Sequence, residues 1–176
     1  MSRRREPAGQ ERVDKIMKTS EPLQPARRPL LTLGLFIVGV VGIGILIGTL
    51  SAPGPWYEAL RKPPFNPPNW IFAPVWTVIY VLIAIAGWRI YRFAPGSLLM
   101  GVWGVQMLFN WAWTPVFFSL QQIWAAFAVI VLLFALVLIF IIRAWNADRM
   151  AALLFLPYAA WVAFAGLLNL SIAVLN

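Results

Sequence analysis

Five apolar stretches of membrane-spanning length dominate this chain and restrict its fold more than any other feature. They fall near residues 30–52, 70–91, 98–120, 123–142 and 150–175. Each has about the 20 residues that an α-helix needs to cross roughly 30 Å of hydrocarbon. The breaks between the last four are short, so consecutive helices should pack as antiparallel neighbours. We therefore predict an all-α integral membrane bundle of five transmembrane helices, because the alternating polarity of a β-barrel is missing.

The composition supports a membrane protein and narrows its chemistry. Hydrophobic residues make up 61% of the chain and charged residues 11%, against about 25% charged residues in soluble domains. The sequence has no Cys and no His, which excludes thiol chemistry, His-ligated metals and Ser-His-Asp triads. The central parts of the spans carry no ionisable group of the kind on which pumps and ion-coupled transporters depend. We predict no catalytic acid or base, no metal site and no obligatory cofactor.

Charge is concentrated outside the spans. Residues 1–29 hold eight of the 14 basic residues and few large apolar ones, which predicts a disordered tail before a membrane domain at residues 30–176. A cleaved signal peptide is the rival interpretation, but the following apolar run is too long for a signal core. The positive-inside rule places the N-terminus in the cytoplasm, and the membrane is the inner one if the protein is bacterial. No stripe of basic residues lies on a folded surface, so we do not expect the protein to bind nucleic acid.

The loop between the first two spans is the only long one, with six prolines between Pro53 and Pro68. Proline fixes φ and removes a hydrogen-bond donor, so the loop cannot be helical throughout. Residues 56–60 could form one helical turn after Pro55. We expect the rest to be a stiff, aromatic-bearing flap at the membrane surface.

Aromatic and amide side chains supply the chemistry within the spans. Gln106 and Asn110 stand four residues apart and share a helix face; they either bond between helices or contact a buried ligand. The chain has ten Trp residues, of which those bordering the spans suit interface belts. The deeper ones either pack in the core or stack on a planar ligand; these are Trp76, Trp103, Trp113 and Trp161. A GxxxG motif at Gly44 and Gly48 permits close helix approach.

Taken together, three groups of residues resemble the TspO/translocator protein family, also called tryptophan-rich sensory proteins or peripheral benzodiazepine receptors. The first group is Trp56-Tyr57, Lys62-Pro63 and the run from Phe65 to Trp76. The second is Gln106, Phe109-Asn110 and residues 113–118, and the third is residues 156–165 with Leu168-Asn169. The resemblance covers residues 30–176. It is specific because all three groups occur together and in this order.

The resemblance implies a five-helix bundle, commonly a homodimer, with a pocket beneath the first loop. It implies porphyrins such as protoporphyrin IX, haem, or other planar hydrophobic molecules as ligands. Carried over by position, the ligand-binding residues are Trp56, Phe65, Trp76, Tyr80, Asn110, Trp113, Phe117, Trp161, Ala165 and Leu168. Trp76 and Trp161 match the tryptophans associated with porphyrin photochemistry. The sterol-recognition pattern of animal members is replaced by residues 170–176, which contain neither an aromatic nor a basic residue.

Three functions fit these expectations. The leading one is a membrane receptor or regulator that binds tetrapyrroles in a Trp-lined pocket. Its role would be in tetrapyrrole homeostasis or stress signalling. Arg61 and Lys62, near the lid, could contact the propionate groups of the ligand. The alternatives are a light-dependent porphyrin-degrading activity and a passive translocator of lipophilic ligands such as sterols. Without ionisable groups in the spans, any translocation should be passive.

Overall fold

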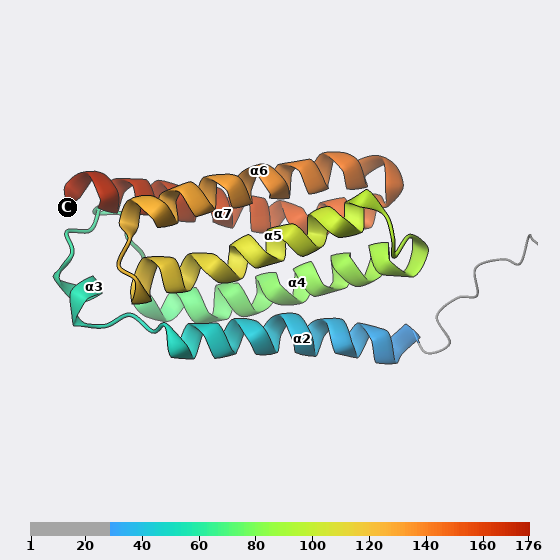
Figure 1. The fold of residues 1–176 in the computed structure, drawn as a ribbon, viewed down its shortest axis with the longest axis horizontal. Helices are drawn as coiled ribbons and strands as arrows, with labels where there is room; N and C mark the ends of the chain where they lie inside the picture. The colour runs from blue at the N-terminus through green and yellow to red at the C-terminus, as the bar shows by residue number, and fades with distance from the viewer. Residues whose placement is uncertain (1–28) are drawn as a thin grey trace, which may run out of the picture.

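The computed structural model describes residues 29–176, and its long helices run side by side along one axis (Figure 1). These helices are α2 (Pro29–Leu50), α4 (Phe72–Phe93), α5 (Leu98–Thr114), α6 (Ile123–Ala147) and α7 (Arg149–Leu175). Two short elements, α3 (Pro55–Ala59) and η1 (Asn69–Ile71), lie in the loop between α2 and α4. A π-helical segment, η2 (Pro115–Ser119), continues α5. The five-helix prediction is confirmed; the predicted disorder of the tail lies outside the described residues.

Four of the helical segments described in residues 29–176 are long and apolar enough to cross a membrane: Pro29–Leu50, Asn69–Phe93, Ile123–Ala147 and Arg149–Leu175. The 17-residue α5 runs directly into the 5-residue η2, and together they span the predicted third stretch. Helices suit lipid because they satisfy their own backbone polar groups. Many large apolar side chains point outward, as a bilayer requires, including Leu35, Val38, Leu108, Leu132 and Leu167.

One predicted boundary is wrong. We expected a break at residues 143–149, but α6 continues to Ala147 and α7 begins at Arg149, so only Asp148 separates them. Hydropathy marks Arg143 and Asn146 as a break, yet both lie on exposed positions of α6 and favour or tolerate helix. Asp148 makes the turn by accepting a hydrogen bond from the Ala151 N–H at 3.2 Å, which caps α7. The single turn predicted after Pro55 is confirmed as α3.

The helices contribute unequally to the core. α7 buries ten residues along its length, whereas α2 buries only Val40 and Gly44. The tightest packing lies where α6 meets α7, with the Phe140 and Phe155 rings stacked at 3.9 Å between centroids. α2 is therefore a peripheral helix, and α7 is the central one.

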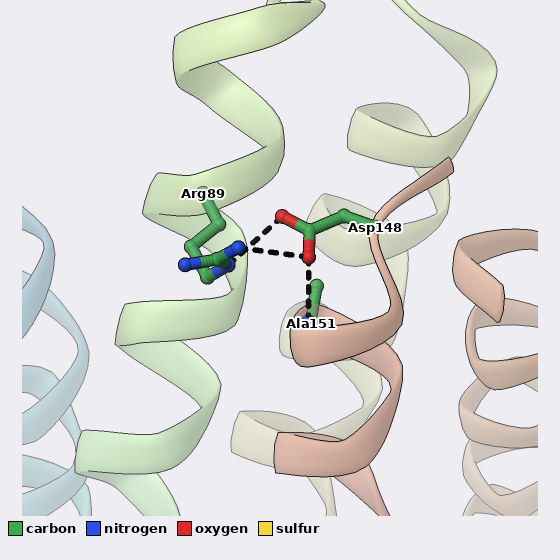
Figure 2. A network of polar contacts seen from close by, with 3 residues as sticks. All are labelled: Arg89, Asp148 and Ala151. Atoms are coloured by element: carbon green, nitrogen blue, oxygen red, sulfur yellow. Dashed lines mark hydrogen bonds and ion pairs between the residues drawn. The ribbon is translucent and has the colours of Figure 1, made fainter. Parts of the chain in front are cut away.

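An ion pair joins α4 to the junction of α6 and α7 (Figure 2). The Arg89 Nε donates to Asp148 Oδ2 at 2.8 Å and its Nη2 donates to Oδ1 at 3.0 Å. Burial of Asp148 alone would raise its pKa, but the Arg89 hydrogen bonds and charge, together with the backbone N–H groups, hold that pKa below its usual value. We call this pair the clamp and this end of the bundle the clamp end. The opposite end, which carries α3 and the C-terminus, is the lid end (Figure 1).

Candidate functional site

A cavity of about 430 Å³ lies at the lid end, between α2, α4, the α5–η2 junction and α7. Its volume is within the range of about 300–1,000 Å³ typical of small-molecule sites. Six of the ten sequence-predicted ligand residues line it: Trp76, Tyr80, Trp113, Phe117, Ala165 and Leu168. None of the residues that line it is acidic or basic. The cavity therefore suits an uncharged, apolar body.

Two pairs of aromatic rings form walls of the cavity. On α4, the Trp76 and Tyr80 rings lie 5.3 Å apart at an interplanar angle of 33°. At the end of α5, the Trp113 and Phe117 rings are stacked at 5.3 Å and 25°. Residues four apart on a helix share a face, which explains both pairings. Such flat apolar surfaces are suited to stacking on a planar ligand.

The π-helical segment η2 sets the direction of the aromatic side chains after Trp113. Here the Leu120 N–H donates to the Pro115 carbonyl, five residues earlier, at 2.9 Å. Single π turns within α-helices are rare and occur frequently at functional sites. The segment brings Phe117, only 2% exposed, to the cavity and Phe118 against Tyr57. Gln121 then turns the chain with φ of 57°, a conformation that few non-glycine residues adopt.

The cavity is covered by residues 51–68, which we call the lid. Tyr57, on α3, is 5% exposed and packs edge-on against Phe118 at 5.2 Å and Phe117 at 6.2 Å. Burial raises the pKa of the Tyr57 phenol. The Lys62 ammonium lies 4.5 Å from the centre of the Tyr57 ring and donates to the Glu58 and Leu60 carbonyls. Lys62 thus stabilises the lid itself and does not line the cavity.

Side-chain hydrogen bonds fasten the lid at two places. The Ser119 hydroxyl donates to the Ser51 hydroxyl at 2.9 Å, between η2 and the start of the lid. The Asn176 side chain accepts from the Arg61 N–H at 2.9 Å and donates to the Arg61 carbonyl at 3.0 Å. We call the Asn176–Arg61 pair the latch. It attaches the middle of the lid to the end of α7.

The polar lining of the cavity is sparse and consists of hydroxyls and amides. The lid supplies Asn66, whose Oδ1 is buried without a hydrogen-bond partner. On the opposite side, the Trp113 indole N–H donates to Asn169 Oδ1 at 3.0 Å, and Asn169 Nδ2 donates to the Ile123 carbonyl at 3.0 Å. Within residues 29–176 no cluster of acidic side chains could hold a metal ion. The site can therefore bind by stacking and by hydrogen bonds.

Asn110 does not line the cavity, which departs from its predicted role. Its Nδ2 donates to the Tyr158 hydroxyl at 2.8 Å, and that hydroxyl donates to Gln106 Oε1 at 2.9 Å. All three side chains are buried, and the bonds join α5 to α7. Of the two interpretations of Gln106 and Asn110, interhelical bonding is the one found in the structure. Asn110 as a ligand contact stays a prediction.

Three further predicted residues lie near the cavity without lining it. Trp161 is behind Trp76, with the two rings perpendicular at 6.5 Å, and it faces a shallow apolar groove between α4 and α7. Its indole N–H is buried without a partner. Trp56 lies on the lid and contacts the edge of the Phe117 ring at 5.9 Å. Phe65, also on the lid, is 46% exposed.

Sequence reasoning missed the contribution of α2 to the site. Gly44 and Gly48, taken as helix-packing residues, both line the cavity. A Cβ on Gly44 would clash with the Tyr80 ring, whereas a Cβ on Gly48 would meet nothing within 4 Å. Gly44 therefore permits Tyr80 to approach α2, and Gly48 leaves space open. Their GxxxG spacing was the available signal, although it also fits ordinary helix packing.

Comparison with known proteins gives a consistent result. The profile of the TspO/MBR family matches residues 35–175. Protein CrtK of Rhodobacter capsulatus is 38% identical over 133 residues, which is 73% of this chain and 83% of the relative. The tryptophan-rich sensory protein of Cereibacter sphaeroides is 33% identical over 142 residues, 81% of this chain and 90% of the relative. The translocator protein of Bos taurus is 38% identical over 121 residues, or 65% and 70% of the two chains.

Proposed function

Because this chain belongs to the TspO/MBR family, we propose that it is a membrane receptor that binds tetrapyrroles such as protoporphyrin IX or haem. Family membership and the apolar helices make it an integral, multi-pass membrane protein with a sensory or translocator role. We assign the ligand to the cavity beneath the lid. Binding of the ligand there would serve tetrapyrrole homeostasis or stress signalling.

The observation that carries this proposal is an uncharged cavity with aromatic walls on two different helices. Trp76 and Tyr80 present rings from α4, and Trp113 and Phe117 present rings from α5 and η2. A macrocycle placed between such walls loses apolar surface to protein and gains stacking contacts. Its carboxylates would have to remain outside the uncharged cavity. Arg61, exposed on the lid, is the cation that we assign to them.

Single-residue variants of the aromatic side chains test the assignment. Protoporphyrin IX is titrated into the purified full chain in detergent and followed by its own absorbance. Trp76→Ala should weaken binding by about tenfold or more, because a lining ring worth roughly 1.5 kcal/mol is lost. Trp161→Ala should weaken it less, since Trp161 acts only by supporting Trp76. Trp124→Ala, which removes a 60% exposed ring on α6, is the control. Unchanged binding by Trp76→Ala would contradict the pocket assignment.

The two alternative functions stay predictions. A porphyrin-degrading reaction would place its photochemistry at Trp76, with Trp161 one ring behind it. Illumination with excess porphyrin separates this activity from simple photobleaching, because only an enzyme yields a distinct product with turnover. Passive translocation of a lipophilic ligand would appear as protein-dependent flux into liposomes.

Topology and assembly belong to the same proposal. We place the tail and the clamp end in the cytoplasm and the lid outside, because the clamp end carries four arginines and the lid only Arg61 and Lys62. If the host is bacterial, this is the inner membrane. We also expect a homodimer. Accessibility labelling of single cysteines in this Cys-free chain would test the orientation.

A further inference from the structure

The clamp end carries more positive charge than its own acids can neutralise. Arg89 is paired with Asp148, which is the only ion pair among residues 29–176. Arg92, Arg143 and Arg149 are exposed and have no acidic partner in that part of the chain. Three guanidinium groups at one end of the bundle are therefore left unneutralised by the acidic side chains of residues 29–176.

Two of these three arginines are held against aromatic rings. The Arg92 guanidinium carbon lies 4.8 Å from the centre of the Trp88 ring and 5.7 Å from that of Phe93. The Arg149 guanidinium carbon lies 6.0 Å from the centre of the Trp145 ring. No such contact is found for Arg143 among the described residues. A guanidinium stacked on a ring is oriented by it, and its N–H edges stay free to bind a phosphate.

The ring beneath Arg92 is itself fixed in place. The Trp88 indole N–H points at the start of α2, with the Pro29 carbonyl at 3.2 Å and the Thr32 hydroxyl at 3.1 Å. The orientation of Arg92 is therefore set by contacts between α2 and α4. Less side-chain freedom remains to be lost when this arginine binds an anion.

The clamp joins the two helix ends that carry the oriented arginines. Arg92 lies about one helical turn beyond Arg89 on α4, and Arg149 directly follows Asp148. Since Arg89 and Asp148 are bonded, α4 and the start of α7 are held together there (Figure 2). Exposed apolar side chains lie beside both arginines, because Phe93 follows Arg92 and Met150 follows Arg149 in the chain. Aromatic residues and arginine at a helix end mark the boundary between headgroups and hydrocarbon.

We propose that Arg92 and Arg149 each bind the phosphate group of an anionic phospholipid in the leaflet at the clamp end. The guanidinium groups supply charge-assisted hydrogen bonds to the phosphate, and the neighbouring exposed apolar side chains contact the acyl chains. A soluble phosphate would gain nothing from those apolar neighbours. This site is separate from the cavity beneath the lid and does not depend on which ligand the cavity binds.

Native mass spectrometry of the full chain tests the proposal. Detergent-solubilised protein is mixed with equal amounts of phosphatidylglycerol and phosphatidylcholine, and the bound lipids are counted. The unaltered chain should prefer phosphatidylglycerol. Arg92→Gln and Arg149→Gln should each lower that preference by about fivefold, whereas Arg143→Gln should lower it much less. Arg61→Gln at the lid end should leave it unchanged. An unaltered unfolding midpoint without added lipid shows that each variant is folded.

The controls separate a defined site from a general surface charge. If Arg143→Gln costs as much preference as Arg92→Gln, net charge alone accounts for the binding and the proposal fails. The proposal also fails if inorganic phosphate displaces the bound phosphatidylglycerol as effectively as phosphatidic acid does. The proposal is likewise contradicted if the Arg92→Gln, Arg149→Gln double variant keeps the full preference for phosphatidylglycerol.

Discussion

The two ends of this bundle are built from the same helices but by different means. At the clamp end, small buried residues such as Ala84, Ala144 and Ala151 allow close approach, and the Arg89–Asp148 pair joins the helices. At the lid end, the same helices surround a cavity, and the cover is a proline-rich loop held by a few hydrogen bonds. A closely packed end can fix the positions of α4 and α7. The other end can then hold a binding site without loss of the fold.

The comparison predicts that damage to the clamp affects stability more than binding. Asp148→Asn removes the charge that faces Arg89, so the free energy of unfolding should fall by about 1.5–3 kcal/mol, the range for hydrogen bonds to charged groups. Reversible unfolding in mixed detergent measures this change. The affinity for protoporphyrin IX at folding conditions should stay within about twofold of the original, since the cavity lies at the other end.

Arg143→Gln is the matched control for the clamp, because it removes a charge at the same end that has no acidic partner among the described residues. Its effect on the free energy of unfolding should be within about 0.5 kcal/mol. Equal losses in Asp148→Asn and Arg143→Gln would show that the clamp does not stabilise this end.

Where α2 packs against the cavity wall, Gly44→Ala should lower both the stability of the fold and the affinity for the ligand. Its added Cβ would clash with the Tyr80 ring, which must then move into the cavity or push α2 away. Overpacking of this kind costs about 1–3 kcal/mol, and porphyrin affinity should fall with it. Gly42→Ala meets nothing within 4 Å and should be neutral or stabilising. Unfolding and binding titrations of the two variants give the comparison, and indistinguishable results would contradict the packing described.

The latch should control rates at the lid end more than stability. Asn176→Ala removes both bonds to the Arg61 backbone, worth about 1 kcal/mol together at an exposed site. Stopped-flow binding of protoporphyrin IX should show association and dissociation both faster by up to about fivefold. Ser171→Ala, which removes a hydroxyl bonded only within α7, should leave the rates unchanged. Identical rates for Asn176→Ala and the original chain would argue that ligand does not pass the lid.

The smallest expected effect is the pH dependence of the clamp. The pKa of Asp148 is lowered in the folded chain from its ordinary value of 3.8, so the unfolded chain binds this proton more readily. Its contribution to stability is fully present above about pH 4 and is lost as the pH falls through the lower folded value. Unfolding midpoints between pH 6 and pH 3 should therefore decline less in Asp148→Asn than in the original chain. Parallel declines would exclude this carboxylate as the cause.

Sequence patterns predicted the clamp end and the lid end unequally well. The five helices, the turn at α3 and six cavity residues follow from apolar length, proline spacing and the family resemblance. The clamp was not predicted, because Arg89 and Asp148 are 59 residues apart and only packing brings them together. Nor was η2, since no residue pattern separates five π-helical residues from an ordinary helix end. The exclusion of Asn110 from the cavity depends on Tyr158, a partner on another helix.

The ligand site beneath the lid is tested most directly by filling the cavity at a glycine that lines it. Gly48 lines the cavity, and a Cβ there meets no atom within 4 Å, so Gly48→Leu should place its side chain in this open space. Protoporphyrin IX titrated into this variant should bind at least about tenfold more weakly, with an unchanged unfolding midpoint. Gly42→Leu, on the same helix and outside the cavity, should bind as the original chain does. Equal affinities for the Gly48→Leu and Gly42→Leu chains would contradict a ligand site beneath the lid.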